Sequence, residues 1–93
     1  MQGKRLDRVN QLIKEEVSMI LQRELKDPRL GFVTVTEVDT SKDLRQAKIF
    51  VSVLGGDEQW KASITGLTSA RGFIRNWLRQ HLELRVTPEL IFR

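Results

Sequence analysis

The sequence predicts a single α+β domain whose elements follow the order helix, strand, strand, helix, helix, strand. Three observations predict this fold class. Apolar residues recur every three or four positions before residue 25 and again after residue 57, a spacing typical of amphipathic helices. Two short segments between these regions are rich in β-branched residues and alternate apolar with polar side chains, as strands do. A length of 93 residues fits one domain with a small core.

The first helix is expected over residues 4–25. Its apolar stripe consists of Leu6, Val9, Leu12, Ile13, Val17, Ile20 and Leu21. The segment Lys26-Asp27-Pro28 ends the helix, because proline forces the residue before it out of the helical conformation. Lys4, Arg5 and Arg8 lie off the stripe in the first turns, where positive charge opposes the helix dipole by up to about 1 kcal/mol. Their position therefore indicates a use other than stability.

Two strands are expected at residues 32–38 and 46–54, joined by the polar turn 39–43. One face of the second strand is apolar: Ala47, Ile49, Val51 and Val53. The short connection predicts an antiparallel pair. A third strand is expected at residues 85–92, where Pro88 fits only an edge position or a strand start, since proline lacks an N–H group.

Two further helices are expected, over residues 57–69 and from there to about residue 82. The earlier helix places three apolar side chains inward: Trp60, Ile64 and Leu67. The later one carries an apolar arc: Phe73, Ile74, Trp77, Leu78 and Leu82. It also carries Arg71, Arg75 and Arg79, whose spacing of four places the guanidinium groups on one side. Gly72 costs about 1 kcal/mol relative to alanine inside a helix, so we expect either a kink there or a close approach by another backbone.

The net charge of +4 is unevenly distributed. Residues 1–30 carry +2, residues 31–59 carry −2 and residues 60–93 carry +4. Such asymmetry is typical of a protein that meets a polyanion with one face, while +4 also lies in the ordinary range for a small soluble domain. The apolar runs are too short for a transmembrane span or a signal peptide, and cysteine is absent. We therefore expect a cytoplasmic protein.

Residues that could perform catalysis are scarce. The single histidine, His81, falls in the apolar arc of the last predicted helix and is expected to be a packed structural residue. The neighbouring carboxylates Glu15-Glu16 and Asp57-Glu58 do not face each other on a helix, and no Walker-type glycine loop occurs. We expect no enzyme, no metal ion and no cofactor.

Six aromatic residues are candidates for stacking on RNA bases: Phe32, Phe50, Trp60, Phe73, Trp77 and Phe92. Proteins that stack bases on a sheet carry their rings on the central strands of a four-stranded sheet, which the predicted element order does not provide. We therefore expect most of these rings in the core. Any RNA would then be bound through charge and close backbone approach.

Several separated motifs occur in an order that one family shares: Arg8-Val9-Asn10, Asp27-Pro28-Arg29-Leu30, Phe32-Val33-Thr34-Val35-Thr36, the segment 43–55, Ala70-Arg71-Gly72-Phe73-Ile74-Arg75 and Pro88-Glu89-Leu90-Ile91-Phe92. On these motifs the sequence closely resembles bacterial ribosome-binding factor A. The resemblance covers nearly the whole chain, and the combination is far more specific than any one motif.

The resemblance implies a type-II KH-like fold, in which residues 1–93 form one RNA-binding domain with a three-stranded sheet packed against helices. It also implies binding to the small ribosomal subunit and its RNA during late maturation, including processing of the precursor RNA and growth in the cold. Other assembly factors are expected as further partners; we expect a monomer and no membrane partner. The family usually continues past the last strand with a polar tail, whereas this sequence ends at Arg93.

KH domains usually clamp the nucleic-acid backbone with a Gly-x-x-Gly loop between two helices, which this sequence lacks. The resemblance places the helix kink Ala70-Arg71-Gly72 at that position as a modified clamp. RNA contacts are expected from a basic helical face: Lys4, Arg5, Arg8, Arg71, Gly72, Arg75, Arg79 and Arg85. The alternative is an α/β protein-interaction module that docks on another factor. Salt separates the two, because phosphate contacts release counterions and apolar contacts do not.

Overall fold

The computed structural model describes the chain from residue 2 to residue 93, with side chains from residue 4 onward. It contains helices α1 (Gln2–Met19) and α2 (Asp57–His81) and strands β1 (Val33–Thr40), β2 (Gln46–Val53) and β3 (Glu89–Phe92). The predicted fold class and order are confirmed. One correction applies, because the two later helices that the sequence predicted are a single helix, α2.

The sheet has the order β1-β2-β3, with β1 antiparallel and β3 parallel to the central strand β2. The predicted antiparallel pair and the edge position of the last strand are thus confirmed. β3 is shorter than predicted and begins directly after Pro88, because the first backbone N–H that pairs is that of Glu89, at 2.8 Å from the carbonyl oxygen of Arg45.

The β1–β2 turn lies two residues later than predicted. Thr40 still pairs with Ala47, and the side-chain amide oxygen of Asn10 on α1 accepts a hydrogen bond of 2.9 Å from the Thr40 N–H. The turn itself is closed by the side chains of Ser41 and Asp43, which bond each other at 2.7 Å. A helix side chain therefore extends β1, which local turn propensity could not indicate.

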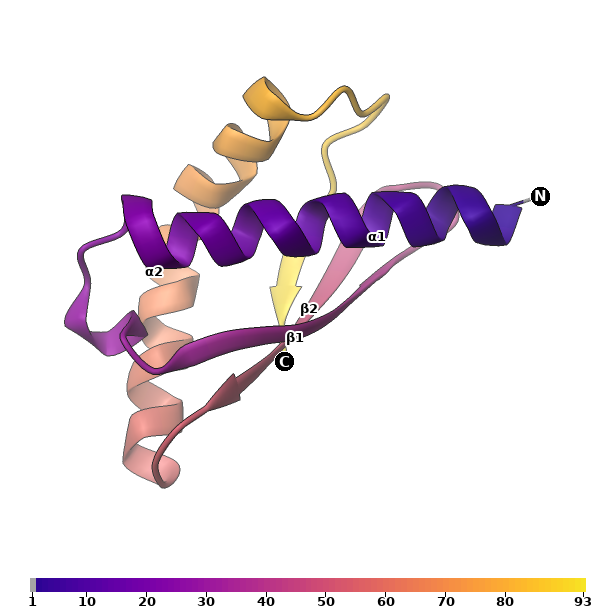
Figure 1. The fold of residues 1–93 in the computed structure, drawn as a ribbon. Helices are drawn as coiled ribbons and strands as arrows, with labels where there is room; N and C mark the ends of the chain where they lie inside the picture. Colours follow the sequence, from indigo (N-terminus) through magenta and orange to yellow (C-terminus); the bar gives the residue numbers. More distant parts are fainter. Residues whose placement is uncertain (1) are drawn as a thin grey trace.

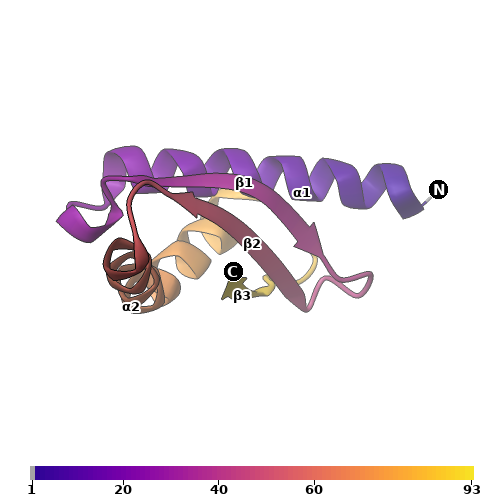
Figure 2. The ribbon, with the colours of Figure 1, turned by 90° about the horizontal axis from the view of Figure 1, so that it is seen from below.

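The helices cover one face of the sheet. In Figure 1, α1 and the orange end of α2 lie above the strands, and Figure 2 looks onto the opposite face, with α1 behind the sheet. Strand residues alternate accordingly between buried and exposed positions. The core consists of Val9, Ile13, Val17, Ile20, Leu21, Leu30, Val35, Val38, Ala47, Ile49, Val51, Leu67, Ile74, Leu78 and Leu90. No helix among the described residues is long and apolar enough to cross a membrane.

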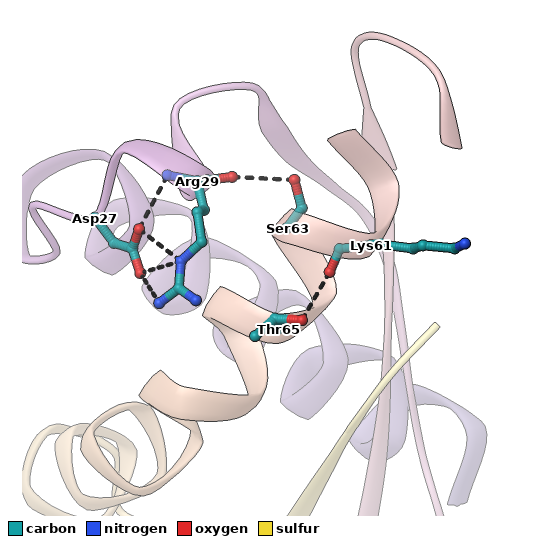
Figure 3. Close-up of polar contacts among 5 residues, drawn as sticks. All are labelled: Asp27, Arg29, Lys61, Ser63 and Thr65. Carbon is teal, nitrogen blue, oxygen red and sulfur yellow. Dashed lines mark hydrogen bonds and ion pairs between the residues drawn. The ribbon is translucent and has the colours of Figure 1, made fainter. Parts of the chain in front are cut away.

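The end of α1 is followed by two short helical turns. A π-helical turn, Ile20–Glu24, closes the helix, and a 3-10 turn, Pro28–Leu30, begins after the Asp27 N-cap. The predicted end of the first helix at the Asp27-Pro28 segment is therefore confirmed. The 3-10 turn then carries the chain to the side of α2 (Figure 3).

The prediction that the aromatic rings belong to the core is wrong for Phe32, Trp60 and Phe73, which are 60%, 40% and 47% exposed. Phe32 directly precedes β1 and lines an open hollow with Leu25, Leu30 and Leu54. Trp60 lies in the first turn of α2, and this end of the helix extends beyond the strands in Figure 2. Leu12, at the edge of the predicted α1 stripe, is also exposed.

Candidate nucleic-acid interface

Helix α2 is continuous through Ala70-Arg71-Gly72, where the sequence predicted a kink between two helices. The ribbon bends about half-way along α2, and the two halves run in different directions in Figures 1 and 2. The chain therefore changes direction without breaking the helix. This geometry divides α2 into a first half, residues 57–69, and a second half, residues 70–81, which have different surroundings.

A close approach by the protein's own chain occurs at Gly66, which the sequence did not indicate. A Cβ at Gly66 would lie 3.0 Å from Cδ2 of Leu30 and 3.4 Å from Cβ of Arg29, so a side chain at this position would push the 3-10 turn away from α2. The nearly fully buried Ser63 donates its hydroxyl to the Arg29 carbonyl oxygen at 3.0 Å (Figure 3). The 3-10 turn therefore covers the surface of the first half of α2 around Ser63 and Gly66.

The 3-10 turn is held in shape by Asp27. Its carboxylate accepts hydrogen bonds from the Arg29 backbone N–H and from Arg29 Nε, each at 2.9 Å (Figure 3). The Arg29 side-chain hydrogen bonds and then its backbone hydrogen bond lower the pKa of Asp27 below 3.8. The ionised carboxylate therefore fixes the turn that packs against Gly66.

Gly72 has open surroundings. Beyond the helix backbone and the adjoining residues, no atom of the described chain lies within 4 Å of the position that a Cβ would take. Gly72 lines a shallow hollow together with Arg75, Asn76 and Arg79. The sequence placed Gly72, Arg75 and Arg79 in one site, and the structure brings these three together on one surface of the second half of α2.

Arg75 is engaged within the chain. Its Nε donates to the carbonyl oxygen of Pro88 at 3.2 Å, and its Nη2 donates to the carbonyl oxygen of Thr87 at 3.0 Å. The same nitrogen lies 3.5 Å from a carboxylate oxygen of Glu89. Arg75 therefore ties α2 to the loop before β3, whereas Arg71 and Arg79 are exposed.

The basic residues near the N-terminus form a separate group. Lys4 and Arg8 are exposed on α1, and Arg5 shares a pocket with Arg85 and Lys42. The structure therefore brings Arg5 and Arg85 together, from chain positions 80 residues apart. Sequence analysis missed Lys42, although its place in a turn after a charged strand was a signal that it would be exposed.

A row of rings runs along the second half of α2. Trp77 and His81 stack with their ring centroids 4.0 Å apart and an interplanar angle of 8°, and Phe73 lies 6.2 Å from Trp77. The Trp77 Nε1 donates to a carboxylate oxygen of Glu16 on α1 at 3.1 Å. The expectation that His81 is packed is wrong, because its helix position lies at the end of α2, where the ring is exposed and covered on one side by Trp77.

Comparison with known proteins identifies one matching family. Residues 5–93 match the family model described as ribosome-binding factor A. The chain is 51% identical over 89 residues to ribosome-binding factor A of Brevibacillus brevis, covering 96% of this chain and 74% of that one. It is 54% identical over 86 residues to the protein of the same name from Carboxydothermus hydrogenoformans, covering 92% and 69%.

Solved structures show the same fold. The crystal structure of ribosome-binding factor A from Thermus thermophilus superimposes with a TM-score of 0.84 at 25% identity, covering 95% of this chain and 93% of that one. A second Thermus thermophilus structure, a homology model of ribosome-binding factor A fitted into the cryo-EM map of its complex with the 30S subunit, gives a TM-score of 0.72 at 27% identity. That comparison covers 88% of this chain and 86% of the other.

Proposed function

This chain belongs to the ribosome-binding factor A family, and we propose that it binds the small ribosomal subunit, contacting the subunit's RNA through the second half of α2 and the basic end of α1. It acts by binding and carries out no catalysis. Binding takes place in the cytoplasm during late maturation of the subunit, including processing of the precursor RNA and growth in the cold.

The observation that carries the proposal is the likeness to a Thermus thermophilus protein fitted into a 30S complex, at a TM-score of 0.72 and 27% identity. An RNA partner also fits the charge of residues 70–88, which form the second half of α2 and the loop after it. This segment contains one carboxylate, Glu83, and four arginines: Arg71, Arg75, Arg79 and Arg85. Cations in such numbers supply affinity for phosphates without reading base identity.

The roles within this surface differ. Arg71 and Arg79 are exposed and reach phosphates, and Gly72 lets the RNA backbone approach the helix because a Cβ is absent there. Arg75 positions the loop that carries Arg85, since its guanidinium group already bonds two backbone carbonyl oxygens. The proposed clamp thus consists of one glycine and two exposed arginines, Arg71 and Arg79, with Arg75 as the support. The Arg79 guanidinium group donates a hydrogen bond to Oδ1 of Asn76, within the same hollow.

Co-sedimentation with purified 30S subunits across a salt series tests the proposal. We expect the wild-type protein to bind with an affinity that falls steeply with salt, and the double variant Arg71→Glu/Arg79→Glu to lose at least about tenfold in affinity at low salt. The matched control is Lys48→Glu/Arg93→Glu, which reverses two exposed charges on the sheet and should bind as wild type does. Equal binding of the two double variants would contradict the proposed surface.

A protein partner remains the second candidate, favoured by one observation. Phe32 and Leu54 are 60% and 72% exposed and adjoin across the strand ends, where the Leu54 N–H donates to the Phe32 carbonyl oxygen at 3.1 Å. Together with Leu25 and Leu30 they line a hollow at the end of the sheet away from the basic residues of α1. Subunit binding that depends little on salt and is lost in Phe32→Ser/Leu54→Ser would favour this surface.

A further inference from the structure

The pocket shared by Arg5 and Arg85 combines charge with an apolar lining. It has a cavity volume of about 210 Å³ and is bounded by α1, the β1–β2 turn and the loop before β3. Pockets for drug-sized ligands occupy roughly 300–1,000 Å³. This pocket therefore fits one small group, such as a single nucleobase.

Three cations surround the pocket: Arg5, Lys42 and Arg85. All three are exposed, and within residues 4–93 none of them forms an ion pair with a carboxylate. The one acidic residue at the pocket is Asp43, whose Oδ1 accepts hydrogen bonds from the Ser41 hydroxyl at 2.7 Å and the Arg45 N–H at 3.1 Å. The carboxylate of Asp43 therefore stabilises the β1–β2 turn through these hydrogen bonds. With three cations and one carboxylate, the pocket has an excess of positive charge.

The remaining lining is apolar and half-buried: Leu6, Leu44 and Val86. Leu44 has a φ of +63°, and among the described residues other than glycine it alone has a positive φ. A bulky residue in this region is strained, and such strain is often found at functional sites. The backbone N–H bond of Leu44 to the Ser41 carbonyl oxygen, 2.9 Å long, would form with glycine as well. The leucine side chain is half-buried, packs with one part against the core and lines the pocket with the rest.

We propose that this pocket receives one unstacked nucleotide of the bound RNA, with its base against Leu6, Leu44 and Val86 and its phosphate among Arg5, Lys42 and Arg85. The proposal rests on RNA being the partner, as argued above. Proteins that recognise single-stranded RNA commonly hold a splayed base on an apolar surface and its phosphate on cations. Here three segments distant in sequence supply the two kinds of contact.

Methyl NMR spectra of the full chain test the pocket directly. The probes are the four ribonucleoside 5′-monophosphates, a short single-stranded RNA and inorganic phosphate. We expect the methyl signals of Leu44 and Val86 to shift in a saturable way with at least one monophosphate and with the RNA at lower concentration, while inorganic phosphate leaves them unmoved. Shifts with monophosphates alone would indicate a free-nucleotide site and overturn the proposal, as would methyl signals that no probe moves.

Variants then connect the pocket to the subunit. Leu44→Gly removes one of the three apolar side chains of the pocket and suits the positive φ. Because Leu44 also packs against the core, circular dichroism at the assay temperature checks that this variant is folded. Lys42→Ala removes one cation from an exposed position. Leu44→Gly is expected to weaken 30S binding by roughly fivefold or more, and Lys42→Ala by several-fold, with Lys48→Ala as the matched control. Wild-type binding by both variants would overturn this pocket alone. Failure of the wild-type protein to bind subunits at all would instead contradict the proposed function.

Discussion

The two halves of α2 contain one glycine each away from the helix ends, and the two glycines have opposite surroundings. Gly66 is buried under the 3-10 turn, where a Cβ would lie 3.0 Å from Leu30 Cδ2, whereas a Cβ at Gly72 would meet nothing within 4 Å. Both glycines cost helix stability to a similar extent. The first is explained by the protein's own packing. No side-chain packing within the described chain explains the second, for which we propose close approach by RNA.

The comparison shows that one residue type in one helix can be packed against the chain or left open on the surface, according to its neighbours. In the first half, Ser63 and Gly66 hold the turn that follows α1. In the second half, Arg75 holds the loop before β3 while Arg71 and Arg79 extend into solvent. The bend therefore lies between a half that packs against the 3-10 turn and a half whose arginines Arg71 and Arg79 are exposed.

Filling the two glycine positions should have the largest effect. We expect Gly66→Leu to lower the free energy of unfolding by about 3 kcal/mol, because the new side chain displaces Leu30 and Arg29. Gly72→Leu should raise it by up to about 1 kcal/mol, since leucine favours the helix and meets open space. Urea denaturation followed by circular dichroism measures both, and a similar loss in the two variants would remove the distinction between the halves.

The support role of Arg75 predicts the next effect. Arg75→Gln should lower the free energy of unfolding by about 1–2 kcal/mol, because the guanidinium bonds to the Thr87 and Pro88 carbonyl oxygens are lost from a partly exposed site. Arg79→Gln serves as the control and should leave stability within about 0.5 kcal/mol. If Arg75→Gln unfolds at the same urea concentration as wild type, Arg75 is free for a partner and its role must be reassigned.

The smallest effect concerns pH and the turn over Gly66. Because Arg29 lowers the pKa of Asp27 in the folded protein below the ordinary 3.8, the ionised carboxylate stabilises the fold above pH 3.8 and this stabilisation is lost as the pH falls through the folded value. Asp27→Asn keeps the helix-capping acceptor and removes the charge. The stability difference between wild type and this variant should be constant near neutral pH and shrink below pH 3.8. A difference that grows on acidification has the wrong sign for this account.

Periodicity in the sequence was sufficient to locate the helical regions and the strand pair, because the buried face of each element repeats with a fixed spacing. It did not show that residues 57–81 form one continuous helix. It could not assign Phe32 or Trp60, since apolar residues are also found in open hollows at the end of a sheet or where a helix extends beyond the sheet. Glycine is unfavourable inside a helix, so its presence correctly indicated that some position in α2 has a role other than helix stability. Only the packing of the 3-10 turn shows that Gly66, and not Gly72, lies against side chains of the protein itself.

The basic site was predicted as one stripe, and the structure divides it. Spacing placed Arg75 beside Arg71 and Arg79, yet the carbonyl oxygens that hold Arg75 come from residues twelve and thirteen positions later in the chain. The pocket that joins Arg5, Lys42 and Arg85 depends on three segments meeting in space. Such contacts between distant segments carry no local pattern, which is why Lys42 and the strained Leu44 were not found.

The central claim is that Gly72 is kept for close approach by RNA at a cost to the helix, and one paired measurement on Gly72→Ala tests it most directly. Thermal unfolding and 30S co-sedimentation are compared for this variant and wild type. We expect the variant to be more stable by up to about 1 kcal/mol and to bind subunits at least several-fold more weakly. A variant that is more stable and binds as tightly as wild type would contradict the claim.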